Sequence, residues 1–395
     1  MLATHEYAPF RGGTATYVHE VAAAAVRQGL PVEVWTVDYT GRHPAARTPG
    51  GVEDGRELFP VVRLRANGRL TPGGLRRLAW GFWRQRRWLR GRPVVLLSVG
   101  AQMAFVLLAA VGQRPGGPVT CFFHGSEVLR FQRNPLWRLL ARAFYRQAHA
   151  FAANTEYVAN LAKESGLLPP RAQVSVAPCG LPETFHMEQT ALDQSRLDEA
   201  GVGDYRVLTV ARLHPRKGQV EVARALGLLP EPLRQRVVYQ VVGTGDEAYR
   251  QAVEVACRAG GVRCEFLGGL DDHALGHIYA RATVYAQASR TLPQSVEGFG
   301  ITFLEAAAYG CPAAAWRSGG VAEAVRDGGT GLLVEEGNVA GLSVAIARLL
   351  TEPELRARLG KQAQEVARTF RWEPAARTLW EVAAGSAAPL PPVEA

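Results

Sequence analysis

Lysine is nearly absent from this chain, in which Lys163, Lys217 and Lys361 stand against 42 arginines in 395 residues. Cysteine is scarce, and its five copies form no C-x-x-C pair. That pattern argues against a disulfide framework or a zinc site made of cysteines. It predicts that the five thiols are reduced, as in a cytosolic protein. No D-x-D pair occurs, which removes the usual way to hold a divalent metal on a sugar nucleotide. No secretory signal is expected, because Met1 leads directly into polar residues.

Long apolar runs are also missing, apart from residues 94–111, where a membrane span has to be considered. Their length lies at the lower edge of what a bilayer requires. We interpret them instead as a buried parallel strand at 94–97 and a helix at 101–110, with Gly100 at the break. The hydrophobic content of 47% and the charged content of 21% are normal for a soluble globular enzyme.

Acidic residues are few in the first half of the chain. Residues 1–182 hold 23 Lys and Arg against 10 Asp and Glu, whereas the remainder holds 22 against 26. This asymmetry indicates that the first half meets an anionic partner, and charge alone leaves both nucleic acid and a membrane surface open. No known nucleic-acid-binding motif accompanies the charge, so nucleic acid is not the expected partner.

The arginines are densest at residues 70–92, where Trp80, Phe82, Trp83 and Trp88 are interleaved with them. We expect a helix over residues 73–90 with a very basic face. That face could lie on anionic lipid. Alternatively, the aromatic side chains pack on the domain while the arginines are solvated, which is slightly favoured.

Short apolar runs alternate with helical segments along the chain, which is the pattern of doubly wound α/β domains. The length suits two such domains better than one core. The strands expected in the first are 1–4, 32–36, 61–64, 94–97, 119–123, 150–153 and 174–177. Those expected in the second are 206–210, 237–242, 263–267, 283–286, 312–315 and 331–334.

A linker is expected near residues 181–185, where the strand pattern stops. We therefore place one Rossmann-like domain at residues 1–182 and another at 183–370. They are expected to face each other across a cleft, with a ligand at the strand ends. Residues 371–384 are expected to form a further helix, and the Ala/Pro-rich residues 385–395 to be disordered.

The most informative segment, E-G-F-G-I-T-F-L-E, runs from Glu297 to Glu305. Gly298 and Gly300 let the backbone approach a ligand closely. The helix expected to begin near Ile301 points its unpaired N–H groups at that turn, and such a helix start attracts phosphate. Acidic residues on both sides of a phosphate site are explained if one carboxylate binds hydroxyls of a sugar and the other binds hydroxyls of a ribose. The segment therefore predicts a nucleotide-sugar site.

A basic loop follows the strand expected at 206–210 and contains Arg212, Lys217 and Gly218. A compact ammonium suits a phosphate oxygen in a crowded site, and the arginine fork can span two oxygens. Taken alone, the loop is explained equally well as a solvated basic turn. Beside the Glu297–Glu305 segment, the phosphate interpretation is favoured.

Two features of the first half lie at expected strand ends. Gly12 and Gly13 separate the first strand from a helix at 15–27, so phosphate or sugar could approach closely there. The pattern is not G-x-G-x-x-G, which disfavours a dinucleotide oxidoreductase. His124 ends the strand at 119–123 and precedes Gly125. A lone histidine more often has a structural role, but the position of His124 at a strand end and before a glycine favours a functional role.

A metal site is not expected. His273 and His277 lie four residues apart on an expected helix, which can be a metal spacing. No H-E-x-x-H pattern and no third ligand is evident, so a solvated helix face is favoured.

In these motifs the chain resembles the family-4 glycosyltransferases of the GT-B fold, and the resemblance covers nearly all of it. The segment from Glu297 to Glu305 is the most specific match. The other matching segments are 11–13, 124–125, 212–218, 242–245, 330–334 and 370–372. The resemblance implies a retaining, metal-independent hexosyltransferase without a cofactor, whose donor is a UDP- or GDP-linked sugar. It also implies that the helix after Trp372 returns to the first domain, which would be the acceptor side.

The resemblance implies a role for each matching residue. Arg212 and Lys217 would hold the diphosphate, Glu297 would bind hydroxyls of the transferred sugar, and Glu305 would bind the ribose. We expect four catalytic residues, which are His124, Glu297, Arg212 and Lys217. The remaining donor-binding positions are Gly12 and Gly13 near the phosphates and the backbone N–H groups of Phe299, Gly300 and Ile301.

The expected acceptor is a glycan or a lipid-linked molecule, and an anionic membrane surface is a further candidate partner. The expected location is the cytoplasm, either free or peripheral on the cytoplasmic membrane face. Cys179 stands where the family usually has asparagine, and the loop at 289–296 is longer than common, which leaves the donor open. The alternatives are a nucleotide-sugar epimerase of the same fold and a non-catalytic nucleotide-sugar-binding protein. Sugar turnover without an acceptor would separate the epimerase from the transferase.

Overall fold

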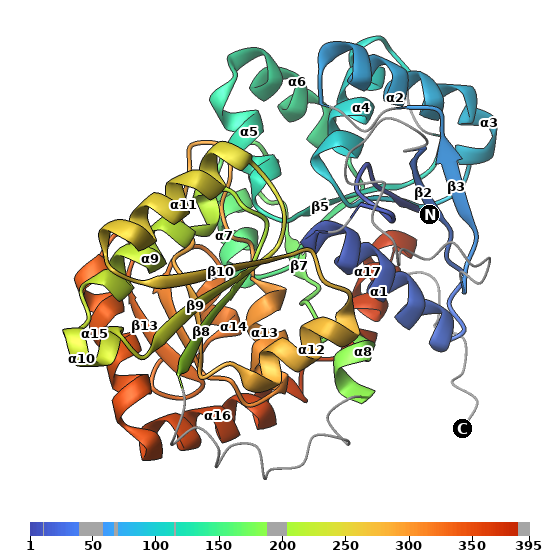
Figure 1. Cartoon of the computed structure of the whole chain (residues 1–395). Helices are drawn as coiled ribbons and strands as arrows, with labels where there is room; N and C mark the ends of the chain where they lie inside the picture. Colours follow the sequence, from blue (N-terminus) through green and yellow to red (C-terminus); the bar gives the residue numbers. More distant parts are fainter. Residues whose placement is uncertain (11, 39–57, 67–69, 114–115, 188–203, 386–395) are drawn as a thin grey trace. The chain divides into compact units, whose positions relative to one another are not determined.

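The structure, a computed structural model, describes residues 1–10, 12–38, 58–66, 70–113, 116–187 and 204–385 (Figure 1). By its contacts the chain divides into two units. Unit 1 comprises residues 1–180, the short segment Pro293–Gly298 and the chain from Arg371 onward. Unit 2 comprises Leu181–Leu292 and Phe299–Phe370. Each unit is built on its own parallel sheet.

Unit 1 contains a seven-stranded sheet in the order β3-β2-β1-β4-β5-β6-β7. Every pairing in it is parallel, so its strands are apolar runs of the kind that is buried on both faces. The order reverses between β1 and β4, and α/β sheets bind ligands outside the carboxyl ends of such strands. The strands are β1 (Leu2–Ala3), β2 (Val34–Val37), β3 (Val61–Leu64), β4 (Val94–Leu96), β5 (Val119–Phe123), β6 (Ala150–Ala153) and β7 (Val174–Val176).

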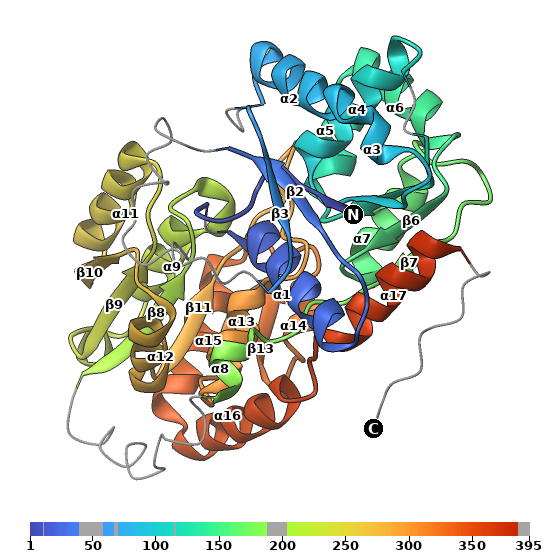
Figure 2. The same cartoon turned by 90° about the vertical axis from the view of Figure 1, so that its right-hand side faces the viewer.

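The last helix of the chain packs on the first helix of unit 1 (Figure 2). The ring of Trp372 meets that of Tyr17 edge-on at 5.2 Å, and Arg27 lies 3.3 Å from the carboxylate of Glu373. After passing through unit 2, the chain therefore returns to unit 1 at α17 (Glu373–Ala384). The helices of unit 1 are α1 (Gly13–Arg27), α2 (Pro72–Arg84), α3 (Arg86–Leu89), α4 (Val99–Ala110), α5 (Ser126–Arg133), α6 (Pro135–Tyr145), α7 (Glu156–Glu164) and α17 (Glu373–Ala384).

Unit 2 contains a six-stranded sheet in the order β10-β9-β8-β11-β12-β13, again wholly parallel. The order reverses between β8 and β11, so the loops after these two strands flank the position where a ligand is expected. The strands are β8 (Tyr205–Val210), β9 (Val237–Val242), β10 (Arg263–Gly268), β11 (Val284–Gln287), β12 (Ala313–Arg317) and β13 (Gly331–Glu335).

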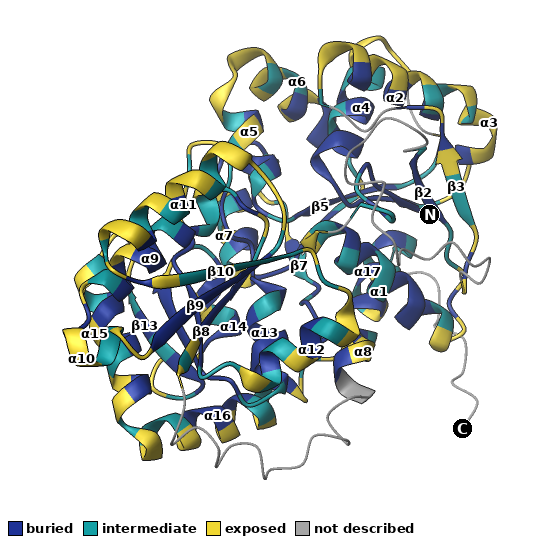
Figure 3. Ribbon diagram, in the orientation of Figure 1, coloured by how far each residue is buried: buried dark blue, intermediate teal, exposed yellow. Residues whose placement is uncertain are grey.

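The helices of unit 2 connect these strands, and the buried residues follow the strands of each sheet (Figure 3). A single 3-10 turn, Pro215–Lys217, follows β8. The helices are α8 (Glu183–Met187), α9 (Gln219–Gly227), α10 (Glu231–Arg234), α11 (Glu247–Ala259), α12 (Asp272–Arg281), α13 (Ile301–Ala308), α14 (Val321–Ala324), α15 (Val339–Thr351) and α16 (Pro353–Ala367).

All thirteen predicted strands are present, but two local predictions are wrong. The helix expected at 73–90 is broken at Gln85, whose backbone leaves the helix (φ −94°, ψ 9°) and allows Leu89 to enter the core. The boundary between the two units, at Gly180 and Leu181, lies beside the linker expected at 181–185, where α8 begins at Glu183 and Phe185 is buried. Gly100 does not break β4 from α4 but lies in the first turn of α4, where a Cβ atom would come 2.5 Å from the ring of His5.

The apolar residues 94–111 are β4, α4 and the residues that join and end them. In the parts of the chain that the structure describes, no helix is both long enough and apolar enough to cross a bilayer. The match at Arg11 and the disorder expected at 386–395 lie outside the described residues.

Candidate functional site

The turn before α13 in unit 2 exposes backbone donors. Gly300 adopts the left-handed conformation (φ 93°, ψ 70°) that glycine tolerates best, and helix α13 begins immediately after it. Glycine has no side chain with which to cap the helix, so the first amides of α13 are available to an anion. Phe299, before the turn, is buried and packs on Phe370 with ring centroids 5.8 Å apart.

The basic loop after β8 is packed tightly on the chain that follows β11. Gly218 has φ 73°, and a Cβ atom there would lie 1.8 Å from the carbonyl oxygen of Ala288. The N–H of Arg290 donates to the carbonyl of Arg216 over 2.8 Å. The guanidinium of Arg290 lies 2.9 Å from the buried carboxylate of Glu221 on α9. These contacts fix the backbone on which Arg212 and Lys217 are carried.

One tyrosine hydroxyl connects this loop to α13. The Tyr285 hydroxyl lies 2.7 Å from Oγ1 of Thr302 in the first turn of α13, 2.8 Å from Oε1 of Gln287 and 3.2 Å from the carbonyl oxygen of Val210. Val210 ends β8, two residues before Arg212. The end of β8 and the start of α13 are therefore held together inside unit 2.

Glu305 is buried in the second turn of α13. Burial raises the pKa of its carboxyl to about 7, and the nearby Asp272 carboxylate adds to that effect. The Tyr279 hydroxyl, which donates to Oε2 over 2.7 Å, and the Lys217 ammonium both lower this pKa. The Lys217 ammonium thus acts on the Glu305 carboxyl, whose pKa of about 7 lets it change its charge near neutral pH.

Glu297 belongs to the segment Pro293–Gly298, which lies on the ends of β5 and β6 in unit 1. It is 6% exposed. The Thr155 hydroxyl donates to the carbonyl of Gly298 over 3.0 Å, and a Cβ atom at Gly298 would lie 2.3 Å from the carbonyl oxygen of His124. Only glycine permits this approach, which places Glu297 in the same unit and neighbourhood as His124.

His124 is held as a neutral imidazole. Its Nε2 lies 3.0 Å from the carbonyl oxygen of Leu97, which can only accept, so Nε2 carries the proton and Nδ1 is an acceptor. Burial lowers the pKa of His124 to about 4. Its backbone N–H donates to Oε2 of Glu127, and burial raises the pKa of that carboxyl to about 7. The imidazole can therefore accept a hydrogen bond from a hydroxyl but is not charged at neutral pH.

Sequence reasoning missed a second buried histidine, His5, directly after β1. Ser98 Oγ accepts the backbone N–H groups of His5 over 2.9 Å and of Ala101 over 3.4 Å, so its own proton is directed to Nδ1 of the His5 ring, 2.8 Å away. The ring proton is then on Nε2, which lies 3.6 Å from the Glu6 carboxylate. Because β1 and β4 flank the reversal of strand order, the strand-end argument used for His124 would also have identified His5.

Comparison with known proteins gives the family. Residues 195–366 match the family model described as glycosyl transferases group 1, and residues 11–185 match the one described as glycosyltransferase family 4. The D-inositol 3-phosphate glycosyltransferase of Frankia alni is 30% identical, over 93% of this chain and 92% of that protein. The chain belongs to the family-4 glycosyltransferases. The family and the GT-B fold predicted from the motifs are thus confirmed.

Other similar proteins match nearly the whole length of the transferase. The GDP-mannose-dependent alpha-(1-6)-phosphatidylinositol monomannoside mannosyltransferase of Mycolicibacterium smegmatis is 28% identical over 98% of both chains. The sucrose-phosphate synthase of Thermosynechococcus elongatus has a TM-score of 0.75 at 21% identity, covering 96% of this chain and 97% of that one. Anabaena HepE in complex with UDP-glucose has a TM-score of 0.69 at 18% identity, covering 97% and 99%. These two structures show the fold alone.

The transferase distributes the predicted residues over its two units. Unit 2 brings together Arg212, Lys217, Phe299, Gly300, Ile301 and Glu305. Unit 1 holds His124 and Glu297, with Gly12 and Gly13 exposed at the start of α1. Arg212 is exposed, and Lys217 is half-buried. The roles that the family implies for these residues stay predictions.

No metal site was predicted for the transferase. Within the described ranges, no group of three or more His, Cys, Asp or Glu side chains is placed to hold a metal ion. His273 and His277 are exposed on α12 with ring centroids 4.7 Å apart.

Gly218→Ala is expected to lower the free energy of unfolding by about 3 kcal/mol or more, because its Cβ would collide with the Ala288 carbonyl in addition to the left-handed strain. Gly328→Ala is the matched control, since Gly328 has φ 68° with nothing within 4 Å of a Cβ atom. The control should cost only about 1 kcal/mol. Urea unfolding of both variants measures the difference. Equal losses would mean that the loop yields readily and that its backbone is not fixed as described.

Proposed function

We propose that this glycosyltransferase moves a hexose from a nucleotide-diphospho-sugar to a lipid-linked acceptor, with retention at the anomeric carbon and without a metal ion. One observation supports this most: in unit 2 the end of β8 is tied to the start of α13 through the Tyr285 hydroxyl. A diphosphate bound there would receive the cations of Arg212 and Lys217 and the first amides of α13.

The charges of this site suit the chemistry of transfer. When the bond from the anomeric carbon to the diphosphate breaks, negative charge builds on the leaving diphosphate. Fixed cations and a helix N-terminus stabilise that charge, which is the task that a divalent metal performs in other enzymes. The loop of Arg212 and Lys217 offers two cations, so we propose that they replace the metal.

Relatives suggest the substrates to test first. The mannosyltransferase of M. smegmatis is named for GDP-mannose and a phosphatidylinositol mannoside, and HepE was solved with UDP-glucose. For this chain we propose a GDP- or UDP-linked hexose as donor and a phosphatidylinositol-type glycolipid as acceptor, with the enzyme peripheral on the cytoplasmic membrane face. We also propose for His124 and Glu297 the role that the family implies, which is to bind hydroxyls of the transferred sugar, since the first offers Nδ1 as an acceptor and the second offers a carboxylate.

The test is an assay of GDP-mannose and UDP-glucose with phosphatidylinositol, phosphatidylinositol mannoside and D-inositol 3-phosphate. We expect one combination to give a product whose new linkage is α, as in the donor, by the one-bond C–H coupling in NMR. We also expect the rate to be unchanged by EDTA. A β-linked product would overturn retention, and a rate lost to EDTA and restored by Mg²⁺ or Mn²⁺ would overturn metal independence. Sugar turnover without any acceptor would instead indicate an epimerase, and donor binding without turnover a non-catalytic protein.

A further inference from the structure

Unit 1 has a stretch of chain with almost no negative charge. From Leu58 to Thr155 the only acidic residue is Glu127, which is buried, while the same stretch contains 16 arginines. The helices of this stretch are α2 to α6, and α4 packs against both α2 and α6 (Figure 1). Any surface that these helices present to solvent is therefore basic.

Helix α2 has both buried apolar side chains and exposed side chains. Leu75, Leu78 and Phe82 are buried against the unit, whereas Arg76 and Trp80 are exposed. Trp80 is 56% exposed and stacks on Trp83 with ring centroids 4.6 Å apart. A large aromatic side chain is thus held at the surface of the helix among arginines.

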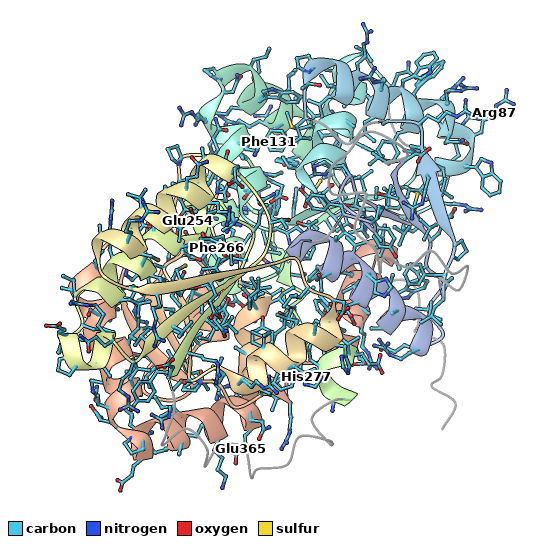
Figure 4. The ribbon with its side chains drawn as sticks, viewed as in Figure 1. Arg87, Phe131, Glu254, Phe266, His277 and Glu365 are labelled. Carbon is cyan, nitrogen blue, oxygen red and sulfur yellow. The ribbon has the colours of Figure 1, made fainter. Side chains whose placement is uncertain are left out.

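Helix α3 continues the same surface. Trp88 is 58% exposed, and beyond the helix the guanidinium of Arg92, which also lies 3.3 Å from the Glu33 carboxylate, covers its ring at 4.8 Å. The guanidinium of Arg86 lies over the ring of Trp83 at 4.1 Å. Arg87 points away from the body of unit 1 (Figure 4). Aromatic rings and guanidinium groups therefore alternate across the two helices.

Helix α6 adds aliphatic side chains. Leu136 is 63% exposed and Leu139 is 66% exposed, and Arg138 and Arg142 on the same helix are exposed as well. We call the exposed side chains of α2, α3 and α6 the arginine–tryptophan face. It combines large apolar groups with positive charge and contains no acidic residue.

We infer that the arginine–tryptophan face docks on an anionic phospholipid bilayer. Tryptophan rings prefer the headgroup level of a bilayer, where their apolar body and polar N–H are both satisfied. Arginine forks bind lipid phosphates, and a basic face is attracted to the negative surface potential. The inference rests on the proposed function in one respect, which is that docking brings the enzyme to a lipid-linked acceptor.

Nucleic acid fits this face less well. Proteins that bind single strands stack bases on open aromatic faces. Here Arg86 and Arg92 already lie over the rings of Trp83 and Trp88, and Trp80 stacks on Trp83. The exposed leucines of α6 also have no role in such binding, whereas they enter a bilayer interface readily.

The experiment measures co-sedimentation of the full chain with vesicles of phosphatidylcholine alone or with about 40 mol% phosphatidylglycerol. We expect binding to the anionic vesicles at least about 10-fold tighter than to neutral ones, and a loss of at least about 10-fold between roughly 50 and 500 mM NaCl. Equal binding to both vesicles, or none at low salt, would overturn the inference. Tighter binding to an oligonucleotide than to anionic vesicles would overturn it as well.

Two variants and a matched control assign the binding to this face. Arg76→Glu with Arg87→Glu, and Trp80→Ser with Trp88→Ser, change exposed side chains and should each weaken binding to anionic vesicles about 10-fold. Arg224→Glu with Arg258→Glu makes the same charge change at exposed positions of α9 and α11 in unit 2 and should leave binding within about twofold. A control that loses as much as the face variants would show a general charge effect and overturn the assignment. Circular dichroism confirms that each variant is folded.

Assays with a water-soluble acceptor separate this inference from the proposed function. The face variants should keep full transfer to such an acceptor while losing transfer to the same headgroup in vesicles. If the wild-type chain binds anionic vesicles but transfers sugar to no acceptor, the proposed function fails and the inference stands. If it transfers sugar but ignores anionic vesicles, the inference fails and the proposed function stands.

Discussion

Lys217→Ala is expected to lower kcat by about two to three orders of magnitude, the loss typical when one fixed group that stabilises transition-state charge is removed. The lysine lies on a backbone fixed by Gly218 and by the contacts of Arg290, and its charge acts on Glu305 at the other side of the site. The leaving diphosphate gains charge in the transition state, so the effect should fall on kcat more than on the affinity for the donor. Steady-state kinetics with the donor at saturation measures it.

Three further variants make that result specific. Arg212→Ala should lose a similar factor, because both cations are proposed to meet the same diphosphate. Lys217→Arg should recover only part of the rate, since a planar guanidinium group does not reproduce the position of a compact ammonium group in a crowded site. Lys361→Ala, at an exposed lysine of α16, should retain the wild-type rate. A Lys217→Ala variant that changed only KM would show that the lysine binds the donor equally in ground and transition states.

The loop of Lys217 also shows which parts of the site are predictable from sequence. Most of the β-strands are short apolar runs followed within two residues by a glycine, proline or polar residue, so the strand ends, where parallel sheets bind ligands, could be located within two residues. The sequence predicts that Gly298 and Gly300 allow a ligand to approach closely, but at Gly298 the structure gives a different reason for the glycine, because the carbonyl of His124 occupies the space of a Cβ atom. At Gly218 the carbonyl of Ala288 does the same. Local chemistry therefore located these glycines without identifying what approaches them.

Contacts between distant residues were not predictable in the same way. The Tyr285 hydroxyl contacts Thr302 and Val210, and the Tyr279 hydroxyl contacts Glu305. These contacts join elements that are far apart in sequence, and their spacing depends on the lengths of the helices between them. A tyrosine in an apolar strand or helix is interpreted as core, since nothing local indicates where its hydroxyl points. The break at Gln85 was missed for a related reason: every residue around it favours helix, and the turn is decided by where Leu89 can be buried.

Donor binding is expected to strengthen with pH between about 6 and 8, through Glu305. Burial holds the pKa of this carboxyl at about 7, so the ligand-free site is largely protonated at pH 6 and largely ionised at pH 8. Hydroxyl groups of a ribose donate more strongly to a carboxylate than to a carboxylic acid. Each unit of pH below the pKa should therefore weaken nucleotide binding by up to about 10-fold. Calorimetric titration with GDP and UDP over this range measures the slope.

Tyr279→Phe tests whether the tyrosine positions and ionises Glu305. Its hydroxyl bond to Oε2 lowers the pKa of the carboxyl, so removing the bond raises that pKa further and shifts the binding profile to higher pH by about one unit. Affinity should fall about 5- to 10-fold at pH 7 and recover near pH 9, a pattern that simple loss of packing would not produce. Tyr249→Phe, which alters a hydroxyl that accepts from the Val220 N–H, should leave the profile unchanged.

Glu305→Gln isolates the carboxyl from the titration of the diphosphate itself. The amide can still accept from Tyr279 and from a ribose hydroxyl but cannot ionise, so whatever pH dependence survives belongs to the nucleotide. At pH 8 this variant should bind about 10- to 100-fold more weakly than the wild type, the worth of a charge-assisted hydrogen bond, and at pH 6 the two should converge because the wild-type carboxyl is then neutral as well. Convergence at low pH is the decisive observation. A constant ratio across the whole range would show that Glu305 acts through its shape and not through its charge, and the ribose role assigned to it would have to be abandoned.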